Sequence, residues 1–77
     1  MSTRCLLEIL DAGCQAGRLS VPLAAQGHAV TGVDTSDLAL RRAKRHARET
    51  GVSLKLLRAD LRRWLPRIPE ASFDAVV

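Results

Sequence analysis

The sequence is poor in aromatic residues: its 77 residues include Phe73, Trp64 and no tyrosine. Any core must therefore be built from leucine, valine, isoleucine and alanine. A platform that stacks the bases of single-stranded nucleic acid is also excluded, because such platforms consist of aromatic side chains. We therefore do not expect nucleic acid to be a partner.

Cysteine is equally scarce, with only Cys5 and Cys14. Two cysteines exclude a disulfide framework and a four-cysteine metal site, and no group of histidine, cysteine and carboxylate residues has metal-ligand spacing. No apolar run approaches the roughly 20 residues of a membrane span, and Glu8 interrupts the Leu6-Leu7 pair. These absences predict a cytoplasmic protein with reduced thiols, no metal and no membrane partner.

The composition itself is globular, with 47% hydrophobic residues and a net charge of +4. The length allows one small domain, which buries only roughly 60% of its unfolded surface. Arginine and lysine recur at helical spacing between Arg41 and Arg48, opposite Leu40, Ala43 and Ala47. We expect this basic face to be solvated, and contact with an acidic partner is the alternative.

Strand and helix patterns alternate along the chain. The expected strands are residues 6 or 7 to 11, 29–34, 53 or 54 to 59, and a last one from 73, with helices over 17–26, 37–49 and 61–65. Such alternation predicts an α/β fold with a parallel four-stranded sheet in the order 3-2-1-4 and right-handed crossovers. The first two helices should then cover one face, and the small third helix should lie on the other, thinly covered face.

A glycine-bearing turn joins the first strand to the first helix, in the stretch Ile9–Arg18. Gly13 and Gly17 tolerate a positive φ and allow a ligand to approach the backbone. The unpaired N–H groups and the dipole at the following helix start would make a pocket floor for an anionic or highly polar small molecule. The alternative is a tight crossover that binds nothing.

Three aspartates, Asp11, Asp34 and Asp60, each end a predicted strand. In a parallel sheet they would meet at the carboxyl edge, where open α/β folds bind ligands. Asp34 follows Gly17 by 17 residues, close to the spacing of about 20 expected for an acid that binds ribose hydroxyls. Taken singly, Asp34 or Asp60 could equally cap the helix that follows.

Four segments together carry a family resemblance: Asp-Ala-Gly-Cys-Gln-Ala-Gly, Val-Thr-Gly-Val-Asp, Arg-Ala-Asp and Ser-Phe-Asp-Ala-Val-Val. In this order and spacing, residues 6 to 77 resemble the first half of class I S-adenosylmethionine-dependent methyltransferases. The resemblance implies a truncated Rossmann-like fold, S-adenosyl-L-methionine as cofactor and methyl transfer as function.

The resemblance also assigns roles within the site. Gly13 and Gly17 would line the methionine part of the cofactor, and Asp11 would order the turn and the ligand's amino group. Asp34 would hold the ribose hydroxyls, and Asp60 the adenine amino group, with the Leu61 N–H near a ring nitrogen. The remaining predicted cofactor-binding residues are Cys14, Gln15 and Thr35.

Three positions have two interpretations. Gln15 stands where the family usually has a glycine, so it would strain a turn that needs a positive φ, unless its amide binds the cofactor. Arg18 could reach the cofactor's carboxylate or be an ordinary surface residue. Trp64 could cover the adenine or pack in the core.

The resemblance leaves the methyl acceptor and the catalytic residues unassigned, and His28 and His46 are not expected to be catalytic. Because the acceptor site of that family is built mainly after the fourth strand, we expect a fragment: a cofactor-binding half-domain that binds weakly and catalyses nothing. An uncovered sheet face and an edge strand also predict self-association.

Three other functions stay open. A nicotinamide or flavin dinucleotide-binding half-domain would share the ribose acid, but the turn lacks the Gly-x-Gly-x-x-Gly spacing. A non-catalytic module could use the arginine-rich helix to hold an acidic partner or RNA. A degenerate remnant would bind no ligand.

Overall fold

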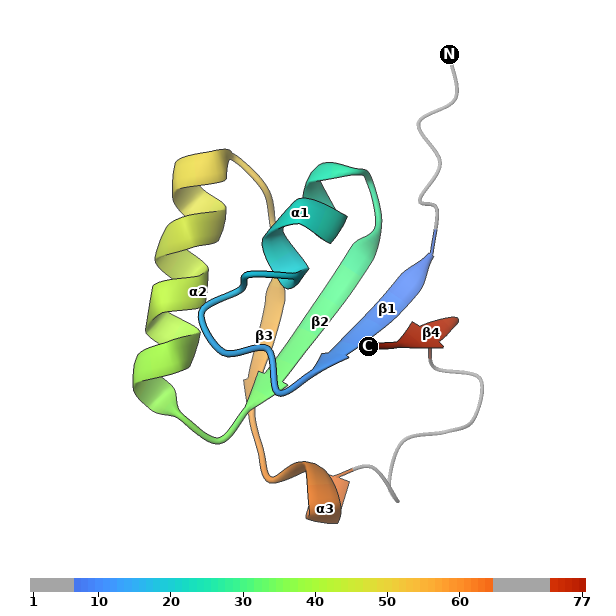
Figure 1. The fold of residues 1–77 in the computed structure, drawn as a ribbon, viewed down its shortest axis with the longest axis vertical. Coiled ribbons are helices and arrows are strands. Elements are labelled where there is room, and N and C mark those ends of the chain that lie inside the picture. Colours follow the sequence, from blue (N-terminus) through green and yellow to red (C-terminus); the bar gives the residue numbers. More distant parts are fainter. Residues whose placement is uncertain (1–6, 65–72) are drawn as a thin grey trace.

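The computed structural model describes residues 7–64 and 73–77. Strands and helices alternate along the chain, as the sequence pattern predicts (Figure 1). The strands are β1 (Glu8–Ala12), β2 (Ala29–Asp34), β3 (Lys55–Arg58) and β4 (Ala75–Val76), and the helices are α1 (Ser20–Ala25), α2 (Asp37–Thr50) and α3 (Leu61–Trp64).

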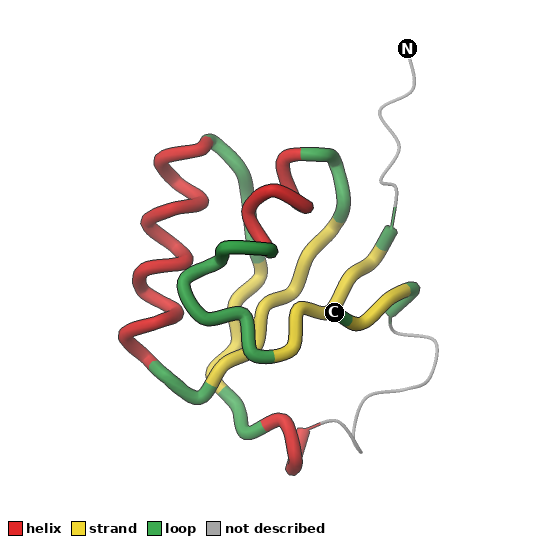
Figure 2. The backbone as a smooth tube through the Cα atoms, viewed as in Figure 1, coloured by secondary structure: helices red, strands yellow, loops and turns green. Residues whose placement is uncertain are grey.

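The four strands form one parallel sheet in the order β3-β2-β1-β4, which confirms the predicted topology (Figure 2). β2 is central: Asp11 pairs with Gly32 on one side, and Gly32 pairs with Leu56 on the other. β1, β2 and β3 therefore end close together, at the edge from which the loops to α1, α2 and α3 leave.

α1 and α2 pack on the same face of the sheet (Figure 1), as expected. α2 turns Leu40, Ala43 and Ala47 inward, and all three are buried. Ile9 and Val30 on the sheet and Val21 on α1 complete this apolar layer. The helical spacing of residues 40, 43 and 47 therefore correctly predicts which face of α2 packs on the sheet.

The first helix begins at Ser20, so the prediction that it begins at Gly17 was wrong. Gly17 has a φ of 83°, which is a left-handed conformation that cannot continue a right-handed helix. α2, by contrast, has both predicted signals. The Ser36 side chain accepts a hydrogen bond from the Ala39 N–H at 3.1 Å, and Gly51 ends the helix at a φ of 82°.

The second face of the sheet differs from the expectation in one respect. α3 lies beyond the carboxyl end of β3 rather than over that face (Figure 1). By strand alternation Leu57 and Val76 belong to this face, and they are 42% and 60% exposed. The predicted end of the third helix at Leu65 lies outside the described residues. Within the described ranges, no helix is long and apolar enough to cross a membrane.

Candidate functional site

In the loop between β1 and α1, several backbone N–H groups donate hydrogen bonds to carbonyl oxygens of the protein itself. The amides of Gly13 and Cys14 both donate to the Val33 carbonyl, at 2.8 and 3.0 Å, and the Gly17 amide donates to the Cys14 carbonyl at 3.0 Å. The helix that follows has only six residues. These three loop amides are therefore already satisfied and are not free to bind an anion. The expected use of the unpaired N–H groups at the helix start stays a prediction.

Asp34 fixes both the loop and the start of α2. Its Oδ2 accepts the Gln15 N–H at 2.9 Å, and its Oδ1 accepts the Ser36 N–H at 2.9 Å. A carboxylate offers about two acceptor sites per oxygen. Each oxygen of Asp34 therefore keeps acceptor capacity, and the carboxylate is held in one orientation before any ligand arrives.

Asp60 is placed in a similar way at the end of the neighbouring strand. Its Oδ1 accepts the Arg62 N–H at 3.0 Å, and the Arg62 guanidinium lies 4.0 Å from the same oxygen. The Asp60 side chain is 45% exposed, so the ion pair contributes little to stability. Asp60 does cap α3, as the alternative interpretation predicted, yet Oδ2 accepts no hydrogen bond from the residues that the structure describes.

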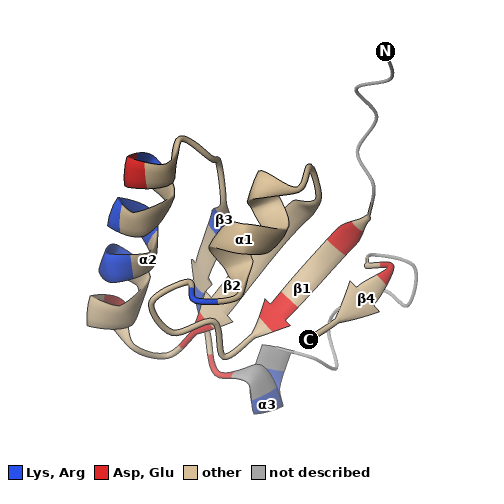
Figure 3. Ribbon diagram, turned by 45° about the horizontal axis from the view of Figure 1, so that its top comes forward, with Lys and Arg blue, Asp and Glu red and all other residues tan. Residues whose placement is uncertain are grey.

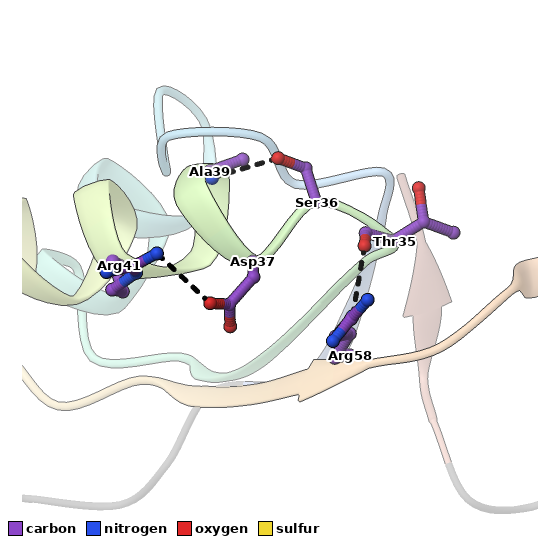
Figure 4. A network of polar contacts seen from close by, with 6 residues as sticks. All are labelled: Thr35, Ser36, Asp37, Ala39, Arg41 and Arg58. Carbon is purple, nitrogen blue, oxygen red and sulfur yellow. Dashed lines mark hydrogen bonds and ion pairs between the residues drawn. The ribbon is translucent and has the colours of Figure 1, made fainter.

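Asp34 and Asp60 line one small pocket at the carboxyl edge of the sheet, with a volume of about 210 Å³. Its other lining residues are Gly13, Thr35, Ala59 and Arg62. Figure 3 shows acidic residues where the strands end at this edge, and Figure 4 shows how Thr35 is held: its carbonyl oxygen accepts from Arg58 Nε at 3.3 Å. The pocket therefore presents two carboxylates beside bare glycine backbone.

Asp11 lies apart from these two acids. It is 4% exposed, and its Oδ2 accepts a hydrogen bond from the buried Ser20 hydroxyl. The structure therefore joins Asp34 and Asp60 in one pocket, while Asp11 ties β1 to α1. Nothing in the sequence pattern singles out Ser20, whose role depends on the path of the loop.

Cys14 and Gly17 are packing residues in this structure. A Cβ on Gly17 would lie 3.3 Å from the Ala43 Cβ, so glycine lets the loop contact α2. Cys14 is buried against Gly32, where an added Cβ would lie 2.8 Å from the Cys14 Sγ. Burial, together with the negative charges of Asp11 and Asp34, raises the pKa of the Cys14 thiol to about 11.

Gln15 adopts a φ of 52°, and it is the non-glycine residue with a positive φ among those described. We expected strain at Gln15 if the turn needed a positive φ, and the structure has that φ. A left-handed conformation costs a residue with a side chain roughly 1 kcal/mol. The side chain is exposed, as is that of Arg18. Leu61 begins α3, and the side chains of Leu61 and Trp64 lie outside the description.

The remaining polar candidates lie elsewhere. His46 is exposed on α2. His28 lines a groove of about 580 Å³ at the opposite, amino edge of the sheet, and its buried Nδ1 has no hydrogen-bond partner among the described residues. Within residues 7–64 and 73–77, no three histidine, cysteine or acidic residues are grouped to hold a metal ion.

The chain is similar in sequence to known methyltransferases. The chain is 42% identical over 55 residues to the ubiquinone biosynthesis O-methyltransferase of Rickettsia canadensis, covering 71% of this chain and 23% of that protein. The enzyme of the same name from Methylocella silvestris is 39% identical over 71 residues, which cover 92% of this chain and 27% of that protein. The chain thus spans about a quarter of the length of these relatives.

Solved structures share the fold. Magnesium protoporphyrin IX methyltransferase from Synechocystis PCC 6803, determined with bound SAM, superposes with a TM-score of 0.77 at 31% identity, covering 97% of this chain and 35% of that one. The PH0226 protein from Pyrococcus horikoshii OT3 gives a TM-score of 0.81 at 28% identity, covering 91% and 32%. The family model for a methyltransferase domain matches residues 9–77. The chain therefore belongs to the family of class I methyltransferase domains.

Proposed function

We propose that this chain holds S-adenosyl-L-methionine for methyl transfer, with the nucleoside part in the pocket formed by Gly13, Asp34 and Asp60. The observation that carries the proposal is that two oriented carboxylates meet in one pocket at the carboxyl edge of the sheet. This edge is where open α/β sheets bind ligands. The family and a neighbour solved with bound SAM support the same ligand.

The donors and acceptors of the pocket fit this cofactor. Asp34 has one oxygen for each hydroxyl of a ribose diol, and Asp60 Oδ2 can accept from the adenine amino group. A dinucleotide, by contrast, places its pyrophosphate on free amides of this loop, and three of those amides are already used.

The cofactor supplies a methyl group on a sulfonium, ready for in-line displacement. The residues of this chain bind and orient it, which is the protein's main contribution to such chemistry. Gln15 and Ser36 hold the Asp34 carboxylate, and Gly13 leaves the pocket wall open. The match covers only about a quarter of the relatives' length, so we assign no methyl acceptor.

We further propose that residues 1–77 act as one partial domain, the cofactor-binding portion of a larger methyltransferase domain. The support is that the chain matches only 23% to 27% of the length of its relatives. Alone it would bind the cofactor weakly and not turn over. The exposed Leu57 and Val76 favour self-association in that state, and the free, buried Cys14 thiol suits a reducing cytoplasmic setting.

Thermal shift measurements test the proposal directly. S-adenosylhomocysteine should raise the melting temperature of the chain and NAD should not, because a ligand stabilises only a fold that binds it. Asp34→Asn should abolish the shift, while Asp37→Asn, an exposed aspartate three residues further on, should preserve it. A shift with NAD alone, or an equal shift in both variants, would overturn the proposal.

A further inference from the structure

A row of cations surrounds an exposed leucine on the outer side of α2. Leu38, Arg41, Arg42 and Arg45, here called the arginine stripe, line a hollow of about 320 Å³. Their spacing of i, i+3, i+4 and i+7 places them on one helix face. The buried residues Leu40, Ala43 and Ala47 occupy the face toward the sheet. The basic side of α2 is visible in Figure 3.

The positive charge of the stripe is largely unbalanced. Arg41 pairs with Asp37 at 3.2 Å, as drawn in Figure 4, and both side chains are mostly exposed. Arg42 and Arg45 make no ion pair with any residue that the structure describes. Like charges one turn apart on a helix repel each other. A bound group of acidic residues would relieve that repulsion.

Leu38 adds an apolar side chain to the charged surface of the arginine stripe. Leu38 is 52% exposed, although it belongs to a helix whose other leucine, Leu40, is buried. Exposed single leucines are common, but this one forms part of a hollow with three guanidinium groups. An apolar side chain inserted there would touch Leu38 and the aliphatic stems of the arginines.

We propose that the arginine stripe docks an acidic, leucine-bearing helical segment of a partner protein. Acidic side chains one turn apart on the partner would meet Arg42 and Arg45, and its apolar residue would meet Leu38. This surface shares no residue with the cofactor pocket. The inference therefore goes beyond the proposed function and does not depend on it.

Nucleic acid fits the surface less well. Asp37 and Glu49 lie near the two ends of α2, so the uninterrupted basic stretch from Arg41 to Arg48 rises only about 10 Å. A patch of that length meets few phosphates, and affinity for nucleic acid depends on how many phosphates are neutralised. The stripe also contains no aromatic side chain for stacking.

Fluorescence anisotropy with the full 77-residue chain tests the proposal. The probe is a labelled synthetic helical peptide that carries one leucine flanked by glutamates at one-turn spacing, and its scrambled version controls for net charge. The test variant is R42E/R45E. The matched control is K44E/R48E, which changes the charge of the same helix equally but on the side that adjoins residues 52–54.

We expect the designed peptide to bind more tightly than the scrambled one, and R42E/R45E to weaken binding about tenfold or more, since reversed charges add repulsion as well as remove attraction. K44E/R48E should change it by less than about threefold, because rim charges outside a contact act only at long range. Leu38→Ser should weaken binding without changing net charge.

The proposal would be overturned by equal loss in the two charge-reversed variants, by equal binding of the designed and scrambled peptides, or by tighter binding of duplex DNA than of the designed peptide. Absence of peptide binding by the folded wild-type chain would do the same. Circular dichroism shows whether each variant retains its helices. The thermal shift with S-adenosylhomocysteine should be the same in all of them, which separates this surface from the cofactor site.

Discussion

Asp34 and Gln15 form one structural unit: the Oδ2 atom of Asp34 accepts the Gln15 N–H at 2.9 Å. The residue that replaces a glycine in the loop is thus held by the same carboxylate that faces the pocket. Asp34 also accepts the Ser36 N–H at the start of α2. Binding at the pocket and order in the loop should therefore change together.

The first prediction concerns Asp34→Asn. The asparagine side chain has one neutral carbonyl oxygen and one NH2 group. One of the two backbone N–H groups therefore loses its acceptor, at a cost of about 1.5–3 kcal/mol, and the other keeps only an uncharged one. Affinity for S-adenosylhomocysteine should fall at least tenfold, and calorimetric titration measures it. Asp37→Asn should leave affinity unchanged, because Asp37 does not line the pocket and pairs with the exposed Arg41. Equal affinities in the wild type and the Asp34 variant would contradict this role.

Replacing Gln15 by glycine should stabilise the chain. The φ of 52° at this position costs glutamine roughly 1 kcal/mol, and glycine's greater freedom in the unfolded state offsets part of the gain. We expect the free energy of unfolding, measured by urea denaturation, to rise by about 0.5 kcal/mol. Gln26→Gly is the control, since Gln26 has a φ of −83° and should gain nothing. Destabilisation by Gln15→Gly would show that the side chain makes a contact that outweighs the strain.

Ser20→Ala should destabilise the fold. It leaves the buried Asp11 carboxylate without the hydroxyl that donates to it, and an unsatisfied buried group costs about 1–3 kcal/mol. The control Ser36→Ala removes a helix cap at an exposed position and should cost about 1 kcal/mol. Urea denaturation compares the two. A larger loss for Ser36→Ala would show that Asp11 finds another partner.

The Cys14 thiol should make stability depend on pH in the alkaline range. Its pKa is about 11 in the folded chain, against an ordinary value of 9.0. Above pH 9 the unfolded chain loses this proton while the folded chain keeps it, so the unfolded state binds fewer protons and stability falls with rising pH. The contribution is complete below pH 9 and is lost toward pH 11.

Melting temperatures of the wild type and Cys14→Ala across this range test the effect. The wild type should lose stability more steeply with pH, and the difference between the two proteins isolates the contribution of the thiol. Parallel curves would show that the thiol is accessible to solvent in the folded chain.

The sequence predicts the sheet order well because apolar runs, capping serines and terminal glycines are local signals. Ser36 and Gly51 bound α2 as expected. It also places Asp34 and Asp60 at one edge, because parallel strands end together. Ser20 and the start of α1 depend instead on the three-dimensional path of the loop. Gly17, with a φ of 83°, allows that loop to continue to Ser20 before the helix begins.

Local sequence patterns do not reveal that the loop amides of Gly13, Cys14 and Gly17 are already hydrogen-bonded within the protein. The Gly13 and Cys14 amides donate to the Val33 carbonyl, which lies on β2, so their hydrogen bonds follow from the pairing of β1 with β2. A glycine-bearing turn before a helix predicts free donors only where the helix starts immediately. The pocket beside this turn is lined by the carboxylates of Asp34 and Asp60, which lie at the ends of other strands.

The central claim is that the pocket between Asp34 and Asp60 receives the nucleoside, and amide chemical shifts measured during titration with S-adenosylhomocysteine test it most directly. The amides of Gln15, Ser36 and Arg62 donate to these two carboxylates. Our account predicts that these three resonances move first and furthest. Changes confined to residues 52–54, at the groove on the amino edge of the sheet, would contradict it.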